Sequence, residues 1–144
     1  MAAGAMHLLP ASTAHARLLS PRPPQTACYL EERDVLVLGD RKWITELYFA
    51  FQDDDFLYLV MEYYSGGDIL TLLSTYDDRM PEDMARFYIA EIVLAIHSVH
   101  QLGYAHRDVK PDNILVAKDG HIRLADFGSC IKLDKEGMVC LALC

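Results

Sequence analysis

The sequence predicts an α+β fold, and three observations support that prediction. Trp43 to Ala50 and Phe56 to Met61 are rich in β-branched and aromatic residues, which is typical of paired strands. Apolar residues recur at helical spacing from Pro81 to Val99. A second strand pair is expected around Asp119-Gly120, because Asp-Gly is a strong hairpin signal. Helices and strands are therefore expected to share one domain within the 144 residues.

Charge and composition exclude several classes of protein. A formal net charge of -8 and a pI near 5.1 argue against a nucleic-acid partner, because phosphate binding requires a basic surface. The most apolar run, Phe87 to Ile96, contains Glu91 and is shorter than the ~18 residues that a membrane span needs, so no span is expected. The four cysteines lack the paired spacing of a zinc site. Reduced thiols in a cytoplasmic protein are the expectation.

Residues 1–27 are expected to form a leader that is disordered or foreign to the domain. The first 30 residues contain no acidic residue, two arginines (Arg17 and Arg22) and a proline-rich patch from Pro21 to Pro24. An organelle transit peptide is the alternative, since the segment is Ala-rich and acid-free. It lacks the repeated arginines of such a peptide, which favours the first interpretation.

The elements that follow the leader can be placed in order. Tyr29 to Val37 has helical spacing and is expected to end near Gly39. The first strand pair turns at Gln52 to Asp55, a polar segment. Gly66-Gly67 then interrupts the chain, and Asp68 stands where it can cap a short helix.

The long helix is expected to begin with Pro81 at its first position, followed by Glu82 and Asp83, and to end before Gly103. Because its apolar residues cover nearly the whole circumference, it is expected in a core. Beyond it, the strands of the second hairpin are expected at Ile114 to Val116 and His121 to Ala125.

The candidate functional residues border that second hairpin. His106-Arg107-Asp108-Val109-Lys110-Pro111-Asp112-Asn113 comes directly before it, and Asp126-Phe127-Gly128 comes directly after it. Because a hairpin returns the chain to its start, Asn113 and Asp126 are expected at the same end. There a carboxamide oxygen and a carboxylate could bind Mg²⁺. Asp108 could accept a proton from a hydroxyl nucleophile, and Lys110 could neutralise charge on a transferred phosphoryl group.

Each of these motifs has a simpler interpretation when taken alone. Asp-Phe-Gly is commonly a turn, His106 could be a core histidine, and Lys110 could be a solvated surface charge. Their combination, in this order around one hairpin, favours a functional origin.

The motifs resemble those of the protein kinase family, and the resemblance covers roughly Cys28 to Leu133. Three segments are similar to the AGC group and, within it, to the myotonic dystrophy kinase and MRCK branch. They are Glu31-Glu32-Arg33-Asp34-Val35-Leu36, Met61-Glu62-Tyr63-Tyr64-Ser65-Gly66-Gly67-Asp68 and Asp126-Phe127-Gly128-Ser129-Cys130. A partial protein-kinase-like fold is implied. Its parts would be a small-lobe remnant (28–60), a hinge (61–67), a large-lobe part (68–133) and a divergent tail (134–144).

The resemblance implies a role for each site residue. Asp108 would be the catalytic base, Lys110 a phosphate contact, and Asn113 and Asp126 the ligands of Mg²⁺. ATP is the implied nucleotide, and the implied residues around it are Met61, Glu62, Tyr64, Asp68, Leu115 and Asp126. Asp68 would reach the ribose, and Glu32 matches a glutamate of the helix beside the site. The implied apolar spine between the lobes consists of Leu36, Leu47, His106 and Phe127.

The implied activity is transfer of the γ-phosphoryl group of ATP to Ser or Thr hydroxyls of proteins. Lys110, two positions after the base, is the serine/threonine pattern of the family. Asp68 and Asp112 match acidic positions that contact substrates in this group. Protein substrates with Ser or Thr near basic residues are therefore implied.

The sequence departs from the family at both ends. The only glycine before Glu32 is Gly4 and the first lysine is Lys42, so neither a glycine-rich loop nor a strand lysine precedes the helix. The resemblance fades after Leu133, and Met138 to Cys144 is apolar. A truncated or alternatively assembled kinase domain is expected. A catalytically silent fragment that acts as an interaction module stays open as the alternative.

Overall fold

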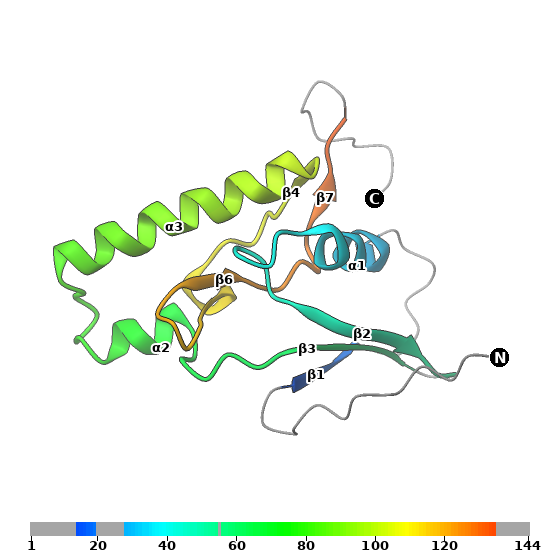
Figure 1. The fold of residues 1–144 in the computed structure, drawn as a ribbon, viewed down its shortest axis with the longest axis horizontal. Helices are drawn as coiled ribbons and strands as arrows, with labels where there is room; N and C mark the ends of the chain where they lie inside the picture. Colours follow the sequence, from blue (N-terminus) through cyan, green and yellow to red (C-terminus); the bar gives the residue numbers. More distant parts are fainter. Residues whose placement is uncertain (1–13, 20–27, 55, 135–144) are drawn as a thin grey trace.

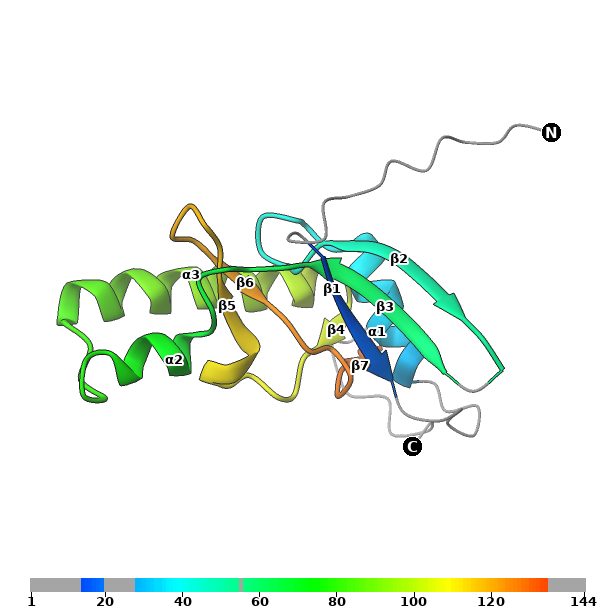
Figure 2. The ribbon, with the colours of Figure 1, turned by 90° about the horizontal axis from the view of Figure 1, so that it is seen from below.

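A long helix lies beside three small antiparallel sheets in the computed structural model (Figures 1 and 2), which describes residues 14–19, 28–54 and 56–134. This mixture of elements confirms the predicted α+β class. The elements in chain order are β1 (Ala14–Leu19), α1 (Cys28–Leu38), β2 (Leu47–Gln52), β3 (Leu57–Glu62), α2 (Ile69–Ser74), α3 (Glu82–Gln101), β4 (Tyr104–Ala105), the 3-10 helix η1 (Pro111–Asn113), β5 (Ile114–Val116), β6 (Ile122–Leu124) and β7 (Ile131–Lys132).

The predicted first strand pair is present as β2 and β3, but β2 begins later than expected. The segment before it is a turn, in which the amides of Trp43 and Ile44 donate to the carbonyl of Asp40 at 2.8 and 2.9 Å. Asp40 also accepts from the Lys42 amide through its side chain, which is a local hydrogen bond that competes with strand formation. Ile44 is buried and bridges to Leu124 in β6, so this turn joins the sheet to the second hairpin.

Strand β1 lies within the segment that was expected to be a disordered leader. It runs antiparallel to β3, from the pair Ala14 and Glu62 to the pair Leu19 and Leu57, and makes β3 the central strand (Figure 2). The local composition did not predict it, because a strand of this kind depends on a partner edge far along the chain. For these six residues the structure has a strand in place of disorder. The rest of residues 1–27 lies outside the described residues.

Helix α1 ends, and helix α2 begins, where the sequence predicts. Helix α1 stops at Gly39, whose amide donates to the Val35 carbonyl at 2.9 Å. It buries Glu32, Val35 and Leu36. Asp68 is the N-cap of α2, since its carboxylate accepts from the Thr71 amide at 2.6 Å. The predicted capping role of Asp68 is therefore confirmed.

Helix α3 ends before Gly103 as predicted, and it begins one residue later than predicted, at Glu82. Pro81 occupies the N-cap position, directly before the first helical residue. Gly103 follows the C-cap with φ +79, a left-handed conformation that glycine adopts without strain, and its amide donates to the His100 carbonyl at 2.9 Å.

The prediction that α3 is buried on all sides is wrong for one face. Within the described residues only Glu91, Ala95 and Val99 of this helix are buried. Phe87, Ile89, Val93 and Leu94 are between 42 and 60% exposed. Helical spacing of apolar residues could not reveal this, because it does not say how many partners a helix has. In this structure α3 packs against β4 and β6 on one side only (Figure 1).

The second hairpin confirms its prediction and lies at the centre of the fold. Strands β5 and β6 pair from Ile114 and Leu124 to Val116 and Ile122, and Gly120 has φ +86 in the turn. The strands of this hairpin contribute four residues to the buried core, and α1 contributes two. The members of the core are Val35, Leu36, Ile44, Leu59, Ile69, Ala95, Val99, Tyr104, Ile114, Val116, Ile122, Leu124, Phe127 and Cys130.

Candidate active site

The ends of the β5–β6 hairpin bring the two halves of the candidate site together. The amide of Ala125 donates to the carbonyl of Asn113 at 2.9 Å, directly beyond the strand ladder. This bond places Asp126 beside Asn113, at the end of the hairpin where the sequence predicted both. The site therefore rests on a rigid element whose strands are buried in the core.

Asp108, Lys110 and Asn113 form one hydrogen-bonded cluster. Lys110 Nζ lies 2.8 Å from Asp108 Oδ2. Asn113 Nδ2 donates to the same carboxylate oxygen at 3.0 Å and to the Asp108 carbonyl at 2.9 Å. Asn113 is buried, whereas Asp108 and Lys110 are open to solvent. Asn113 thus holds Asp108 through its amino group, and its Oδ1 is the atom that suits a cation.

The electrostatics of this cluster favour the charged form of both ionisable members. The hydrogen bond from Lys110 lowers the pKa of Asp108 and outweighs the opposing effect of desolvation. The same bond raises the pKa of Lys110, with further contributions from Asp112 and Asp126. At neutral pH the cluster therefore presents a carboxylate acceptor beside an ammonium group.

His106 connects the segment that contains Asp108 to the Asp-Phe-Gly segment. The Asp108 amide donates to His106 Nδ1 at 3.2 Å, so the ring proton is on Nε2, which donates to the Ala125 carbonyl at 3.0 Å. The ring also packs against Phe127, with centroids 4.9 Å apart. His106 and Phe127 are both buried, which agrees with the predicted core position of this histidine.

Two residues of the site have backbone conformations that side chains rarely adopt. Arg107 has φ +67 and Asp126 has φ +59. Such conformations cost about 1–3 kcal/mol each and persist where surrounding contacts hold them. Arg107 is held by a 2.7 Å hydrogen bond from its Nε to the Ser129 carbonyl. Strain at both ends of one cluster is typical of a functional site.

The stability of this region should depend on pH through His106. Burial lowers the pKa of His106, with partial opposition from its hydrogen bond to Ala125 and from the charges of Asp126 and Asp108. The unfolded chain takes up a proton near pH 6.5 whereas the folded histidine stays neutral. We therefore expect the free energy of unfolding to fall as pH decreases below about 6.5.

Urea unfolding of the 144-residue chain between pH 5 and 8 would measure this dependence. The His106→Gln variant, which cannot titrate at this position, should show a shallower slope over the same range. Equal slopes in the two proteins would contradict the assignment.

Apart from Asp126, which follows β6, the residues predicted around a nucleotide lie on the segment from β3 to α2 and on β5. Met61 packs against the core at the end of β3, and the Glu62 amide donates to the Glu46 carbonyl at 2.9 Å. The segment is tied to β5 where the Val116 amide donates to the Gly67 carbonyl at 2.8 Å, next to Leu115. These contacts bring the segment and Leu115 to one region.

Gly66 and Tyr64 fix that segment from two sides. A Cβ atom at Gly66 would stand 2.4 Å from the Val116 carbonyl oxygen, so the approach to β5 requires glycine. Tyr64 is buried, and its hydroxyl accepts from the Glu46 amide at 3.3 Å. Burial and a hydrogen bond to Glu62 raise the pKa of the Tyr64 hydroxyl, which stays protonated at neutral pH.

Glu91 has a structural role that was not predicted from the sequence. This residue lies on the buried side of α3, where its carboxylate accepts from the Ile122 amide at 3.0 Å and contacts His121 Nδ1 at 2.6 Å. It thereby fastens α3 to the β5–β6 hairpin that carries the site. A lone acidic residue within an apolar helical run was the available signal, because a buried carboxylate requires partners.

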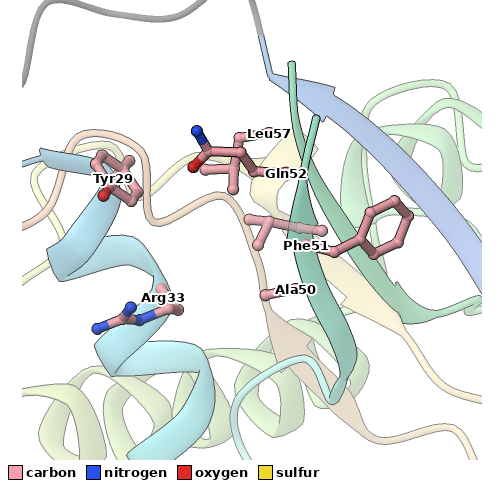
Figure 3. Close-up of a pocket in the computed structure, with 7 residues that line it drawn as sticks. Tyr29, Arg33, Ala50, Phe51, Gln52 and Leu57 are labelled. Atoms are coloured by element: carbon pink, nitrogen blue, oxygen red, sulfur yellow. The ribbon is translucent and has the colours of Figure 1, made fainter. Parts of the chain in front are cut away.

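A pocket of about 250 Å³ lies apart from this cluster, between α1 and the β2–β3 hairpin (Figure 3). Tyr29 and Arg33 line it from the helix, and Gln52 and Leu57 are among the strand residues. Phe51 points away from α1 in the same view. None of the predicted catalytic or nucleotide-binding residues lines this pocket.

The donor set of the cluster fits a nucleotide-bound Mg²⁺ better than a metal held by protein alone. Among residues 14–19, 28–54 and 56–134 no group of three or more His, Cys, Asp and Glu side chains could hold a metal ion. Mg²⁺ commonly takes one or two protein oxygens, with water and substrate phosphates as its other ligands. Asp126 and the Oδ1 of Asn113 match that requirement.

Among the helices that the structure describes, none combines the length and the hydropathy that a membrane span requires.

Comparison with known proteins gives a consistent result. A family model described as "Protein kinase domain" matches residues 20–142. Serine/threonine-protein kinase MRCK alpha of Homo sapiens is 71% identical over 115 residues, and Myotonin-protein kinase of Mus musculus is 70% identical over 115 residues. Serine/threonine-protein kinase MRCK gamma of Mus musculus is 68% identical over the same length.

Each of these alignments covers 80% of this chain, which spans 7% of the MRCK proteins and 18% of the myotonin kinase. Proteins of this family generally use ATP and Mg²⁺ and act on protein substrates. The match extends over most of the chain and includes both halves of the candidate site. The chain therefore belongs to the protein kinase family, in which it is similar to the MRCK and myotonin kinases of the AGC group.

Proposed function

We propose that this chain carries the catalytic loop and the metal-binding residues of a serine/threonine protein kinase. The observation that supports this most strongly is the hydrogen-bonded cluster of Asp108, Lys110 and Asn113, joined to Asp126 through the Ala125–Asn113 bond. The reaction would transfer the γ-phosphoryl group of ATP to a Ser or Thr hydroxyl.

Asp108 acts as the base in this proposal. Its carboxylate is ionised at neutral pH and exposed enough to meet a substrate hydroxyl, whose proton it accepts. Asn113 holds Asp108 through two hydrogen bonds from Nδ2, one to its carboxylate and one to its main-chain carbonyl. Lys110 stays cationic and stabilises negative charge on the phosphoryl group during transfer.

Asn113 and Asp126 would hold Mg²⁺ through Oδ1 and a carboxylate oxygen. When bound, the ion neutralises charge on the phosphates of the nucleotide. The positive φ of Asp126 and the hydrogen bond from the neighbouring Ala125 amide to the Asn113 carbonyl constrain the backbone of this residue, which supports the proposal. Both donors would then be in place before the nucleotide arrives, which lowers the cost of binding.

The nucleotide would bind along the segment from β3 to α2. Met61, Glu62 and Tyr64 would line the adenine through side-chain and backbone groups, with Leu115 on the other side. Asp68 would reach the ribose with the oxygen that does not cap α2, since the cap bond uses Oδ1.

Substrates with basic residues near the target Ser or Thr fit the charges around this site. Asp112 is exposed and lies close enough to Lys110 to influence its pKa, and Asp68 lies at the start of α2. Carboxylates at the mouth of the site favour cationic neighbours of the hydroxyl. A cytoplasmic location is part of the same proposal.

A chimera tests the proposal directly. Residues 28–133 would replace the corresponding segment of human MRCK alpha, whose sequence is 71% identical over 115 residues. We expect the chimera to phosphorylate Ser/Thr peptides, to prefer arginine or lysine near the target, and to lose that preference progressively as salt is raised.

The unaltered MRCK alpha kinase domain is the reference. A chimera that folds and binds nucleotide but transfers no phosphate would refute the catalytic role of the segment. Preference for acidic or proline-directed peptides would refute only the substrate part.

A further inference from the structure

Glu32 carries a carboxylate on the inner face of α1. It is 3% exposed, and Leu36, one turn further along the same face of the helix, is buried in the core cluster. A carboxylate in such surroundings is costly unless a cation or hydrogen-bond donors stand beside it. The face of α1 that carries Glu32 therefore favours a positively charged neighbour.

The two faces of the β1–β3–β2 sheet differ in what they meet. Leu57 and Leu59 of β3 line the pocket on the side of α1, together with residues of that helix (Figure 3). Tyr58, between them, stacks on Phe51, which points away from α1. Successive residues of a strand alternate between the two faces of a sheet. Leu57 and Leu59 thus mark the face that α1 covers.

Strand β1 brings an arginine to a position on that covered face. Residues that stand opposite each other in an antiparallel pair share one face of the sheet. The register of β1 and β3 pairs Arg17 with Leu59, which is 1% exposed. By its place in the strand, Arg17 therefore belongs to the same side of the sheet as α1 and Glu32. A cation there requires an acidic neighbour as much as a buried carboxylate requires a cation.

The other charges of this region are occupied elsewhere. Across residues 28–54 and 56–134 the buried carboxylates are those of Glu32 and Glu91, and Glu91 is bonded to the β5–β6 hairpin. Arg33, next to Glu32 in the helix, pairs with Asp34 at the surface at 2.9 Å. Burial and register therefore match Glu32 with the arginine of β1.

We propose that Arg17 is the cationic partner of Glu32, which makes β1 a part of the candidate site. Protein kinases pair the glutamate of this helix with a strand lysine, and the sequence has no lysine before Lys42. A guanidinium group offers a carboxylate two parallel N–H donors, which an ammonium group does not. The charge would thus come from a different residue type, on a strand that the local sequence does not predict.

A double-mutant cycle in the complete 144-residue chain tests this pairing without nucleotide. Arg17→Gln and Glu32→Gln should each lower the urea midpoint of unfolding, because each leaves one charge without its partner. The double variant should lower the midpoint by less than the sum of the two single shifts, since neither charge is then left. Arg17→Lys keeps the positive charge and should shift the midpoint less than Arg17→Gln.

Arg86→Gln is the matched control for the cycle. Its side chain is 71% exposed on α3, where it pairs with Glu82 at 2.8 Å. Combined with Glu32→Gln, it should give additive shifts of the midpoint, because the two residues share no partner. Additive shifts for Arg17→Gln and Glu32→Gln as well would overturn the proposal.

Titration with ATP and Mg²⁺ adds a readout that rests on the proposed function. The strand lysine of kinases pairs with nucleotide phosphates as well as with the helix glutamate. Arg17→Gln should therefore weaken nucleotide binding by at least about tenfold, and Arg17→Lys should weaken it less. Non-additive midpoints in a chain that binds no nucleotide would support the pairing of Arg17 and refute the nucleotide part of the proposed function. Additive midpoints in a chain that binds nucleotide would refute the pairing alone.

Discussion

Asp108→Ala in the MRCK alpha chimera is expected to lower kcat by about 100- to 10,000-fold while nucleotide binding stays unchanged. The carboxylate accepts a proton mainly in the transition state, so its removal affects turnover and not the ground state. Asp108 contacts Lys110 and Asn113, both of which keep their other roles in the variant. Peptide phosphorylation would measure kcat, and calorimetric titration with ATP and Mg²⁺ would measure binding.

Asp126→Ala should behave differently in the same assays. A metal ligand contributes in both the ground state and the transition state, so the variant should lose binding of Mg²⁺-nucleotide together with turnover. Asp83→Asn is the matched control, because its carboxylate is 97% exposed at the start of α3, away from the cluster. Equal losses of nucleotide binding in the Asp108 and Asp126 variants would contradict the separate roles.

Phe127→Ala is expected to lower the free energy of unfolding by about 3–5 kcal/mol, the usual cost of removing a buried phenyl ring. Phe127 is fully buried in the core and packs against the His106 ring at 4.9 Å. Its loss would remove a contact between the segment that contains His106 and Asp108 and the segment that carries Asp126. Urea unfolding of the 144-residue chain would measure the change.

Phe49→Ala is the control for that measurement. The chemical change is the same, but Phe49 is 49% exposed in β2. Its truncation should therefore lower the free energy of unfolding by less than half as much as that of Phe127. Similar losses in the two variants would show that Phe127 is not a core residue in solution.

The local elements were predictable because each depends on neighbouring residues. Asp68 caps α2 through an amide three positions along the chain, and Gly120 adopts the left-handed conformation that the β5–β6 turn needs. The candidate site was predictable for a related reason. A hairpin returns the chain to its start, which brings Asn113 and Asp126 together without any distant partner.

Elements that depend on distant partners were not predictable in the same way. Strand β1 forms against β3, whose residues lie 38 to 48 positions further along the chain, and its own composition indicated disorder. Asn113 holds Asp108 through Nδ2 and leaves Oδ1 for a cation, and this division of its two side-chain atoms also appears only in three dimensions. The same applies to Glu91, which joins α3 to the site hairpin through His121 and Ile122.

The sequence by itself determined the α+β class, the hairpin and the residues that border it. Turns and the periodicity of strands and helices depend on residues that are close together in the sequence, so they can be recognised there. Only the tertiary structure decided which side of α3 is covered. Apolar spacing predicted burial all round, yet β4 and β6 contact one face, and Ile89 and Val93 are 60% and 59% exposed. The physical reason is that burial is a property of a pair of surfaces, and a helix sequence specifies only its own.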